Sequence, residues 1–344
     1  MPTGRAHGWG IAGEYLTREI SKLPFLNGVT LHCISGHDLR PMNPADWDRI
    51  NIGYCFFEND IETLRHTRRA AREWDFIVAG STWCEYQLRI GGVNRTATVL
   101  QGVDPANFFP VPYREEDGRF IVFSGGKFEY RKGQDLVIAA MRVFMQRHLD
   151  AYLACSWINQ WPFSLATMAQ SRYIKYHHSS EECVSILQRT LHENGIPPER
   201  VYLAPLIDNK LIRQIYQQTD IGIFPNRCEG GNNMVMCEYM ACGRTVIASN
   251  ATGHADVITD RNAFPLTSYT PVISSNAAGS PSGVWHEAAV EELIELLEFA
   301  YHNRNVCVQK GSVAANDMKT LAWDKAAREF HAIAVSLSAG AAQT

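Results

Sequence analysis

The segment FPNRCEGGNNMVMCEYMACGRTVIASN, from Phe224 to Asn250, limits the folds open to this chain more than any other segment. It follows the apolar run IGIF at 221–224, which predicts a buried strand, and begins with a glycine-rich loop. A helix is predicted from Asn233 to Gly243, and the apolar run TVIAS after it predicts a second buried strand. This order is typical of parallel α/β layers, and the free amides at the helix start form an anion site.

Two carboxylates, Glu229 and Glu238, flank this predicted anion site. Backbone amides and the positive end of the helix dipole favour phosphate, whereas carboxylates accept hydrogen bonds from hydroxyl groups. A pocket with both kinds of group fits a nucleotide-sugar, because its diphosphate and its hydroxyls need different partners. The segment therefore predicts a nucleotide-sugar site.

Short apolar runs alternate with amphipathic helices along the chain, which predicts parallel α/β layers throughout. The predicted strands lie at 29–35, 51–57, 75–80, 96–100, 119–125, 151–155, 201–205, 221–224 and 245–249. The predicted helices lie at 13–23, 61–72, from Ser81, and at 134–148, 182–194, 209–218, 233–243 and 286–301. The polar segment 112–118 separates two units, so a domain boundary is expected there.

Residues 267–284, TSYTPVISSNAAGSPSGV, differ in composition from the rest of the chain. They contain no charged side chain and are rich in Ser, Gly and Pro. Segments of this kind are mobile lids or disordered spacers, and the spacer is favoured here.

A second candidate site, GGKFEYRKG, directly follows the predicted strand at 119–125. It carries Lys127 and Lys132, and glycines beside them let the backbone approach a ligand; these are Gly125, Gly126 and Gly133. Parallel strands end at the same edge of a sheet, so this loop and the loop of Glu229 are expected to face one ligand. Two ammonium groups and a helix N-terminus would then hold a diphosphate. The alternative is that both lysines are solvated surface charges.

The bulk composition excludes several other functions. The formal net charge of −4 gives no global attraction to nucleic acid. The nine cysteines are scattered, odd in number and never spaced as CxxC, which argues against a disulfide framework or a zinc site and favours a reducing compartment. No run approaches the roughly 18 apolar residues needed to span a bilayer. A cytoplasmic protein, soluble or peripheral on the membrane, is expected.

Several motifs together resemble the retaining GT-B glycosyltransferases of family 4 (glycosyl transferases group 1). The GGK…KG loop is similar to the "GR…KG" element of that family, with Lys127 where arginine is usual. CEGGNNMVMCEYMACG resembles its Glu…Glu element. FIVAGSTWCEYQL and TVLQGVDPANFFP resemble the segments that close its N-terminal domain, and LAWDKAAREF resembles its final helix. The matches occur in order from about residue 74 to 330.

The resemblance implies a fold and an activity. The fold would be α/β of the GT-B type, with two facing Rossmann-like domains, each built on a parallel sheet. A short N-terminal domain (1–113) would be completed by a returning C-terminal helix (320–338), and 114–319 would bind the nucleotide-sugar. The enzyme would transfer a hexose from a UDP-, GDP- or ADP-sugar to a glycan, lipid-linked or small-molecule acceptor with retention. No metal or cofactor is expected, because lysines and a helix dipole replace the metal.

Residue roles follow from the same resemblance. Lys127 and Lys132 would neutralise the departing diphosphate. Glu229 would face the hydroxyls of the donor sugar, and Glu238 would accept hydrogen bonds from the ribose. The other expected donor contacts are Gly10, Gly125, Gly126, Gly230, Gly231, Asn232, Asn233 and Met234.

This sequence departs from the family pattern at two places. Eight residues separate Glu229 from Glu238 where seven are usual, so the loop between them is remodelled. At the front, the loop HGWGIAG begins at His7 without a preceding strand, so a short first domain with an exposed edge is expected. His7, Trp9, Gly10 and Gly13 would contact the donor phosphate or the acceptor, or would form an ordinary turn before a helix.

Glu58 stands where retaining members of the family often have a histidine. It would orient the acceptor or the donor sugar, or act as a general base; the alternative is that Glu58 and Asp60 cap a helix. The basic residues of the next predicted helix would either touch an anionic membrane or lipid-linked acceptor, as in polysaccharide assembly, or form a solvated face. These residues are Arg65, Arg68, Arg69 and Arg72.

Other functions stay open at this point. A GT-B sugar-nucleotide epimerase would share the donor site, and a catalytically silent GT-B subunit would fit the short first domain. The presence of both lysines and both glutamates in the sequence argues against a catalytically silent subunit. A dinucleotide dehydrogenase is disfavoured, because no GxGxxG motif follows a predicted strand.

Overall fold

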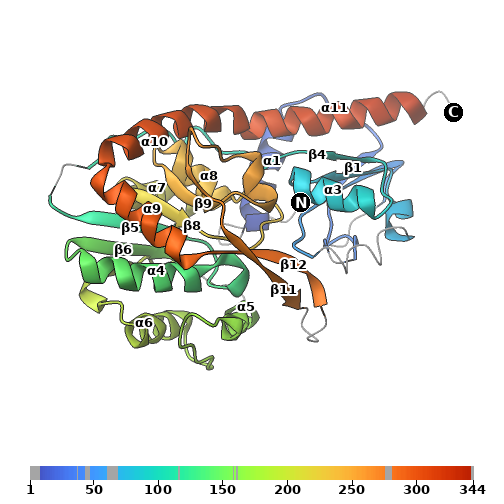
Figure 1. Ribbon diagram of the computed structural model, residues 1–344. Helices are drawn as coiled ribbons and strands as arrows, with labels where there is room; N and C mark the ends of the chain where they lie inside the picture. The colour runs from blue at the N-terminus through green and yellow to red at the C-terminus, as the bar shows by residue number, and fades with distance from the viewer. Residues whose placement is uncertain are drawn as a thin grey trace.

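The computed structural model describes residues 8–36, 38–42, 47–59, 69–114, 117–157, 159, 162–275 and 281–341. These residues form two α/β lobes, each built around a parallel sheet (Figure 1). The expected fold class, two Rossmann-like domains with parallel sheets, is confirmed. The chain passes from the first sheet to the second between Thr98 and Phe120, and the expected domain boundary lies within that interval.

The first sheet has four parallel strands in the order β1-β2-β3-β4. They are β1 (Val29–Cys33), β2 (Ile50–Cys55), β3 (Phe76–Ala79) and β4 (Thr96–Thr98). Alternate residues of β2 point to opposite faces, as the pleat requires. Ile52 and Tyr54 join the cluster of buried side chains that includes α1 (Gly8–Ile20) and α11 (Trp323–Ala341). Cys55 joins the cluster on the face of α3 (Thr82–Ile90).

The second sheet has six parallel strands in the order β10-β9-β8-β5-β6-β7. They are β5 (Phe120–Gly125), β6 (Ala151–Ser156), β7 (Val201–Leu203), β8 (Ile221–Phe224), β9 (Val246–Ser249) and β10 (Phe264–Leu266). One face is covered by α4 (Gln134–Arg147), α6 (Cys183–Glu193) and α9 (Val290–His302). The other is covered by α7 (Arg213–Tyr216), α8 (Met234–Ala241) and α10 (Arg304–Met318). The short helix α5 (Pro162–Ala166) follows β6.

The strand order reverses between β5 and β8. The chain runs outward from β5 through β6 to β7 and then returns to β8 on the other side of β5. In such sheets, ligands bind beyond the carboxyl ends of the strands at the point of reversal. The loops after β5 and β8 are the two loops that carry the lysine and glutamate motifs, so the topology brings both to this point.

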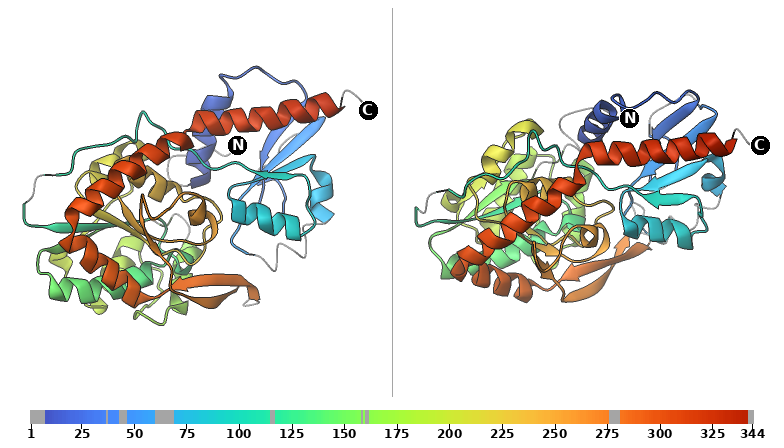
Figure 2. Two further views of the ribbon diagram at one scale, coloured as in Figure 1. Left: turned by 45° about the horizontal axis from the view of Figure 1, so that its top comes forward. Right: turned by 90° about the horizontal axis from the view of Figure 1, so that it is seen from above.

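Helix α11 returns from the second lobe to the first, as expected (Figures 1 and 2). Its start is fixed at the connection between the lobes, where the amide of Val103 donates to the carbonyl of Leu321 at 2.6 Å. Along the helix, Trp323 stacks on Tyr15 of α1, and Phe330 packs edge-on against Tyr54 of β2. The helix thus supplies part of the core of the first domain.

The prediction of a structureless spacer at 267–284 is wrong. Most of the described residues of this segment lie in two antiparallel strands, β11 (Tyr269–Ser275) and β12 (Pro281–Ala288), and residues 276–280 lie outside the described ranges (Figure 1). The overall composition hid several β-branched side chains, which favour strands; they include Thr270, Val272, Ile273 and Val284. The hairpin contacts the first domain, where Trp285 Nε1 donates to the carbonyl of Glu58 at 2.7 Å and Ser282 Oγ donates to Asn59 at 3.2 Å.

Other boundaries differ locally from the predictions. The helix expected at 286–301 starts at Val290, because β12 continues to Ala288. The helix expected at 209–218 is a 3₁₀ turn, Asn209–Leu211, followed by the single turn of α7; Asp208 accepts the amide of Lys210 and fixes that turn. Short 3₁₀ turns also occur at Ala71–Glu73, Tyr130–Lys132, Thr167–Gln170, Pro198–Arg200, Thr252–Asp256 and Lys319–Leu321.

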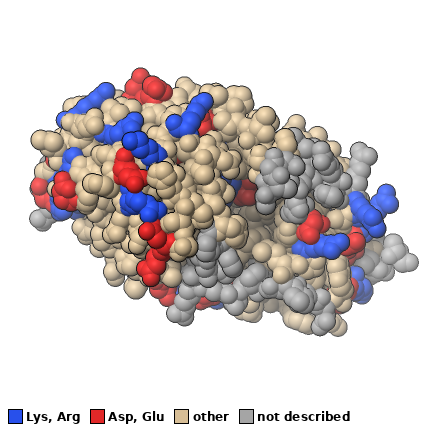
Figure 3. Space-filling model, turned by 90° about the horizontal axis from the view of Figure 1, so that it is seen from below, with Lys and Arg blue, Asp and Glu red and all other residues tan. Residues whose placement is uncertain are grey.

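Two observations on the described residues bear on membrane contact. No helix within the described ranges is long and apolar enough to cross a bilayer. On the face in Figure 3, acidic and basic side chains are interspersed, without a broad area of one sign. Of the proposed basic patch, Arg69 and Arg72 are exposed, whereas Arg65 and Arg68 lie outside the described residues.

Candidate active site

Two loops meet at the point of strand reversal, and glycines make the contact between them. Gly125 ends β5 and lies against Val235 in the first turn of α8. Gly133 has φ +74° and lies against Pro225, so that a Cβ atom there would overlap the carbonyl oxygen of Pro225. Both the left-handed conformation and the close approach require glycine. The glycine that follows Lys132 in the "KG" motif is therefore required by the packing between the two loops.

Lys132 and Glu229 form an ion pair between these loops. Lys132 Nζ lies 2.6 Å from Glu229 Oε2, and both side chains are only about one-tenth exposed, at 11% and 10%. Arg131 Nη1 and Asn226 Nδ2 also donate to Oε2, at 3.2 and 2.7 Å. Burial by itself raises the pKa of Glu229, but Lys132 and Arg131 outweigh it and lower the pKa to about 2. Glu229 is therefore held as a carboxylate.

Arg131 connects this pair to further acids. Its Nη1 lies 3.3 Å from Glu58 Oε1 of the first domain, and its Nη2 donates to Glu129 Oε1 at 2.7 Å. Lys127 is 43% exposed and lies 3.6 Å from Glu129. The cluster thus sets three cations, Lys127, Arg131 and Lys132, against three carboxylates. Because the charges balance, a bound diphosphate would have to compete with these carboxylates for the cations.

Glu238 lies on the second turn of α8 in a different environment. It is 4% exposed, and Asn209 Nδ2 donates to its two oxygens at 3.0 and 3.2 Å. Burial raises the pKa of Glu238 to about 8, and the hydrogen bond from Asn209 only partly opposes this. Asn209 in turn accepts from the hydroxyl of Tyr15, on α1 of the first domain, at 3.0 Å. The two glutamates of the motif are therefore in opposite electrostatic states.

Asn233 joins the remodelled loop to α8. It has φ 56°, in the left-handed region, and its side chain accepts the amide of Met236 and so caps the helix. Its Nδ2 lies 3.0 Å from His254 Nε2. Because Nδ2 can only donate, Nε2 accepts and the imidazole is neutral; burial lowers the pKa of His254 to about 4. We interpret this capped left-handed turn as the place where the longer Glu229–Glu238 spacing is taken up.

The middle of the same loop packs against the first domain. The carbonyl of Gly230 accepts from Ser81 Oγ at 2.8 Å, and a Cβ atom on Gly230 would overlap Phe57. Gly231 has no room for a side chain beside Gln101. The amide group of Asn232 pairs in both directions with the backbone of Gln101, at 3.1 and 2.9 Å. These three residues hold the domains together in this structure.

The start of α1 also lies close to this region. The Cα position of Gly8 approaches the Met234 side chain at the start of α8. Gly10 and Gly13 are buried within α1, and Trp9 packs edge-on against Tyr54 and Phe56. His7 and Asp60 lie outside the described residues.

The structure places several of the predicted site residues near the point where the strand order reverses. Lys132, Glu229 and Glu58 form one contact network, Glu238 and Met234 lie on the adjoining helix, and Lys127 and Gly126 lie at the outer edge. Sequence reasoning missed four of the polar partners. Arg131 could have been found as the neighbour of Lys132; the others had no local signal and are Asn209, Asn226 and His254.

Comparisons with known proteins bear on the fold and on the kind of reaction. Residues 178–271 match the family model described as Glycosyl transferases group 1. No curated protein matches the sequence. Among solved structures, sucrose-phosphate synthase from Thermosynechococcus elongatus has a TM-score of 0.63 at 16% identity, over 86% of this chain and 69% of that one.

Two further structures are similar at the same level. Anabaena HepE in complex with UDP-glucose has a TM-score of 0.59 at 15% identity, over 85% of this chain and 72% of that one. A trehalose-6-phosphate synthase, studied for glycosyl transfer with retention, has a TM-score of 0.65 at 13% identity, over 95% and 79%. These similarities establish the GT-B fold of the chain. The family segment spans α6 to β10 and contains both Glu229 and Glu238, which indicates glycosyl transfer.

Proposed function

We propose that this chain transfers a hexose from a nucleotide-sugar to an acceptor hydroxyl, with retention of anomeric configuration and without a metal ion. The observation that carries the proposal is the buried Lys132–Glu229 pair at the strand reversal, with Glu238 on the second turn of the helix that follows Glu229. Together these groups offer cations for a diphosphate, a carboxylate for sugar hydroxyls and a second acid for the ribose.

The cations of this cluster have a chemical role at the leaving group. When the bond between the sugar and the diphosphate breaks, negative charge grows on the diphosphate, so fixed positive groups there stabilise the transition state more than the ground state. Lys132 is held at this position by its ion pair with Glu229, and the start of α8 adds the positive end of the helix dipole. Lys127, at the exposed edge, would contact the outer phosphate oxygens. These groups supply the charge that a metal ion supplies elsewhere.

Retention fits attack from the same face as the leaving diphosphate, which needs no protein nucleophile. Glu58 reaches the donor network from the first domain, 3.3 Å from Arg131, with about a third of its side chain exposed. This position supports a role for Glu58 in orienting the incoming acceptor hydroxyl, and we propose that role. The acceptor would enter from the first domain, and a glycan, a lipid-linked sugar or a small molecule all remain candidates.

The first experiment identifies the nucleotide base of the donor. HepE has been solved with UDP and with UDP-glucose, so UDP-sugars are the first donors to test, with GDP- and ADP-sugars beside them. A ligand that binds only the native state raises the thermal midpoint by mass action. Failure of every nucleotide-sugar and every nucleoside diphosphate to raise the midpoint would overturn the proposal.

Lys132→Ala tests the chemistry. Loss of a fixed donor to a developing charge typically lowers kcat by about 100- to 1,000-fold, and we expect a loss of at least this size. Lys319→Ala, an exposed lysine far along the chain, is the matched control and should leave turnover unchanged. Near-normal turnover of Lys132→Ala would remove the leaving-group role.

Three readouts of the same assay separate the remaining alternatives. Transfer to an added acceptor distinguishes a transferase from an epimerase, and donor hydrolysis distinguishes an active enzyme from a silent subunit. The anomeric configuration of the product, read by NMR, tests retention. Addition of Mg²⁺ or Mn²⁺ to chelator-treated protein should not raise turnover.

A further inference from the structure

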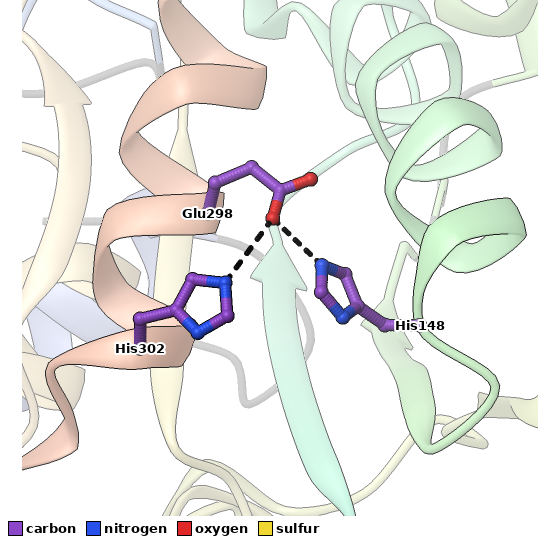
Figure 4. Close-up of side chains that lie close together, drawn as sticks. All are labelled: His148, Glu298 and His302. Atoms are coloured by element: carbon purple, nitrogen blue, oxygen red, sulfur yellow. Dashed lines mark hydrogen bonds and ion pairs between the residues drawn. The ribbon is translucent and has the colours of Figure 1, made fainter.

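A second polar cluster lies at the far end of α4 from the donor site. His148 directly follows α4, and Glu298 and His302 lie near the end of α9, which packs beside it. Figure 4 shows the three side chains pointing toward one another across the gap between the two helices. Helix α4 begins next to Lys132, and its 14 residues at about 1.5 Å each place the cluster roughly 20 Å away. It is therefore separate from the donor site.

The distances suit a shared ion. Glu298 Oε2 lies 2.7 Å from His148 Nε2 and 3.9 Å from His302 Nε2, and the three ligand atoms lie within 4.8 Å of one another. In a tetrahedral site with bonds of about 2.0–2.2 Å, ligand atoms are roughly 3.3 Å apart. Closing the set needs shifts of about 1 Å, and the exposed ring of His302 is free to make them. Glu298 and His302 are four residues apart, so they share one helix face.

Two of the three ligands are held in place beforehand. The ring of His148 packs against Phe144 and Tyr301, with centroids 4.7 and 4.0 Å away. Arg147 Nη1 donates to Glu298 Oε1 at 3.0 Å, which leaves Oε2 directed at the imidazoles. Such outer partners orient metal ligands. A simple ion pair between Glu298 and His148 would explain the position of the His148 ring, but it would not explain why the His302 ring faces the same oxygen.

The helix ends add to the electrostatic argument. Both α4 and α9 terminate at this cluster, and the carbonyl ends of helices carry partial negative charge that favours a cation. Two imidazoles and one carboxylate suit Zn²⁺ and neighbouring transition metals, whereas Mg²⁺ and Ca²⁺ prefer all-oxygen sites.

We propose that His148, Glu298 and His302 bind one transition-metal ion of the Zn²⁺ class, with water in the fourth position. The ion joins the end of α4 to the end of α9 and so braces the helix that begins at the lysine loop. Its role is structural, and it takes no part in the transfer chemistry.

The test is zinc binding to the full chain. Protein stripped with a chelator is titrated with ZnCl₂ by calorimetry, and a thermal unfolding scan is recorded with and without one equivalent. We expect one site and a raised midpoint. His302→Ala, at an exposed position that does not threaten folding, should weaken binding by about 10- to 100-fold or more, since even the loss of an outer partner has an effect of that size. Glu298→Gln should act in the same direction.

His192→Ala is the matched control, because His192 is an exposed imidazole near the end of α6. It should bind zinc like the wild type. Titration with CoCl₂ should give the visible absorption of a tetrahedral site in the wild type and in His192→Ala but not in His302→Ala. Absence of zinc binding, or binding that survives both His302→Ala and Glu298→Gln, would overturn the proposal.

Discussion

Glu229 and Glu238 show how local environment sets the chemistry of a single residue type. Both are buried, yet their pKa values move in opposite directions, to about 2 and about 8. Two cations contact Glu229, whereas Glu238 receives only the amide of Asn209. Burial thus favours the protonated form of Glu238 near neutral pH, in which the carboxyl group can both donate and accept hydrogen bonds.

The raised pKa of Glu238 predicts a pH dependence of stability. The pKa is about 8 in the folded protein against 4.5 for an ordinary glutamate, so the folded state binds this proton more tightly than the unfolded state. The contribution is complete below pH 4.5 and is lost as the pH rises through 8. Glu238→Gln removes the titrating group, so its free energy of unfolding should fall less between pH 5 and pH 8 than that of the wild type.

Urea unfolding at the two pH values measures this difference. Glu199→Gln, at an exposed glutamate of a 3₁₀ turn, is the control. Its free energy of unfolding should change between pH 5 and pH 8 by the same amount as that of the wild type. If the free energy of unfolding changes equally between the two pH values in the wild type and in Glu238→Gln, the carboxyl group is not held in its neutral form.

At the scale of elements, the candidate site depends on the junction between the loop after β5 and the loop after β8. Gly133 opens α4 in the left-handed region and lies against Pro225, which sets the distance between the two loops. The hairpin β11–β12 closes another side, since Trp285 bonds to the backbone of Glu58. Contacts between the short elements around the site thus set their relative positions.

Gly133→Ala tests this junction. Gly118 also has a left-handed φ, +83°, but open space around its Cα position, so Gly118→Ala isolates the conformational cost, about 1–2 kcal/mol. Gly133→Ala adds the overlap with Pro225 and should cost about 1–3 kcal/mol more. Denaturant unfolding measures the two variants, and nucleoside-diphosphate affinity should fall only for Gly133→Ala. Equal stability of the two variants would show that the loops can separate without penalty.

At the scale of the whole molecule, side chains from both domains contribute to the candidate site. Tyr15 of α1 donates to Asn209, which bonds to Glu238. Near the second loop, Asp256 accepts the amide of Thr82 at the start of α3, at 2.8 Å. The first domain therefore helps to set the geometry of a site whose residues belong mainly to the second.

Tyr15→Phe measures this coupling. Removing one hydroxyl that positions Asn209 should weaken nucleotide binding by roughly 2- to 10-fold, the range of a single net hydrogen bond. Tyr86→Phe, on an exposed face of α3, is the control and should bind like the wild type. Calorimetric titration with UDP, or with whichever nucleotide binds, gives both affinities; an unchanged affinity for Tyr15→Phe would contradict the coupling.

The sequence by itself determined the parts that depend on local pattern. Buried strands such as 221–224, the glycines beside Lys132 and the helix after Asn233 follow from periodicity and from backbone conformations open to few residues. The order of these elements predicted parallel α/β layers and the meeting of the two motif loops at one sheet edge, and the resemblance of the motifs to a known family predicted the GT-B fold. Local pattern was not enough for the hairpin at 269–288, whose strands are stabilised by pairing with each other and by contacts with the first domain.

Only the tertiary structure decided which groups touch and how they are charged. Arg131 bonds to acids from three separate segments, Glu58, Glu129 and Glu229, and no local pattern encodes such a meeting. The same holds for the contrast between Glu229 and Glu238. A pKa depends on burial and on charges a few ångströms away, and these are fixed by residues distant in sequence that the fold brings together.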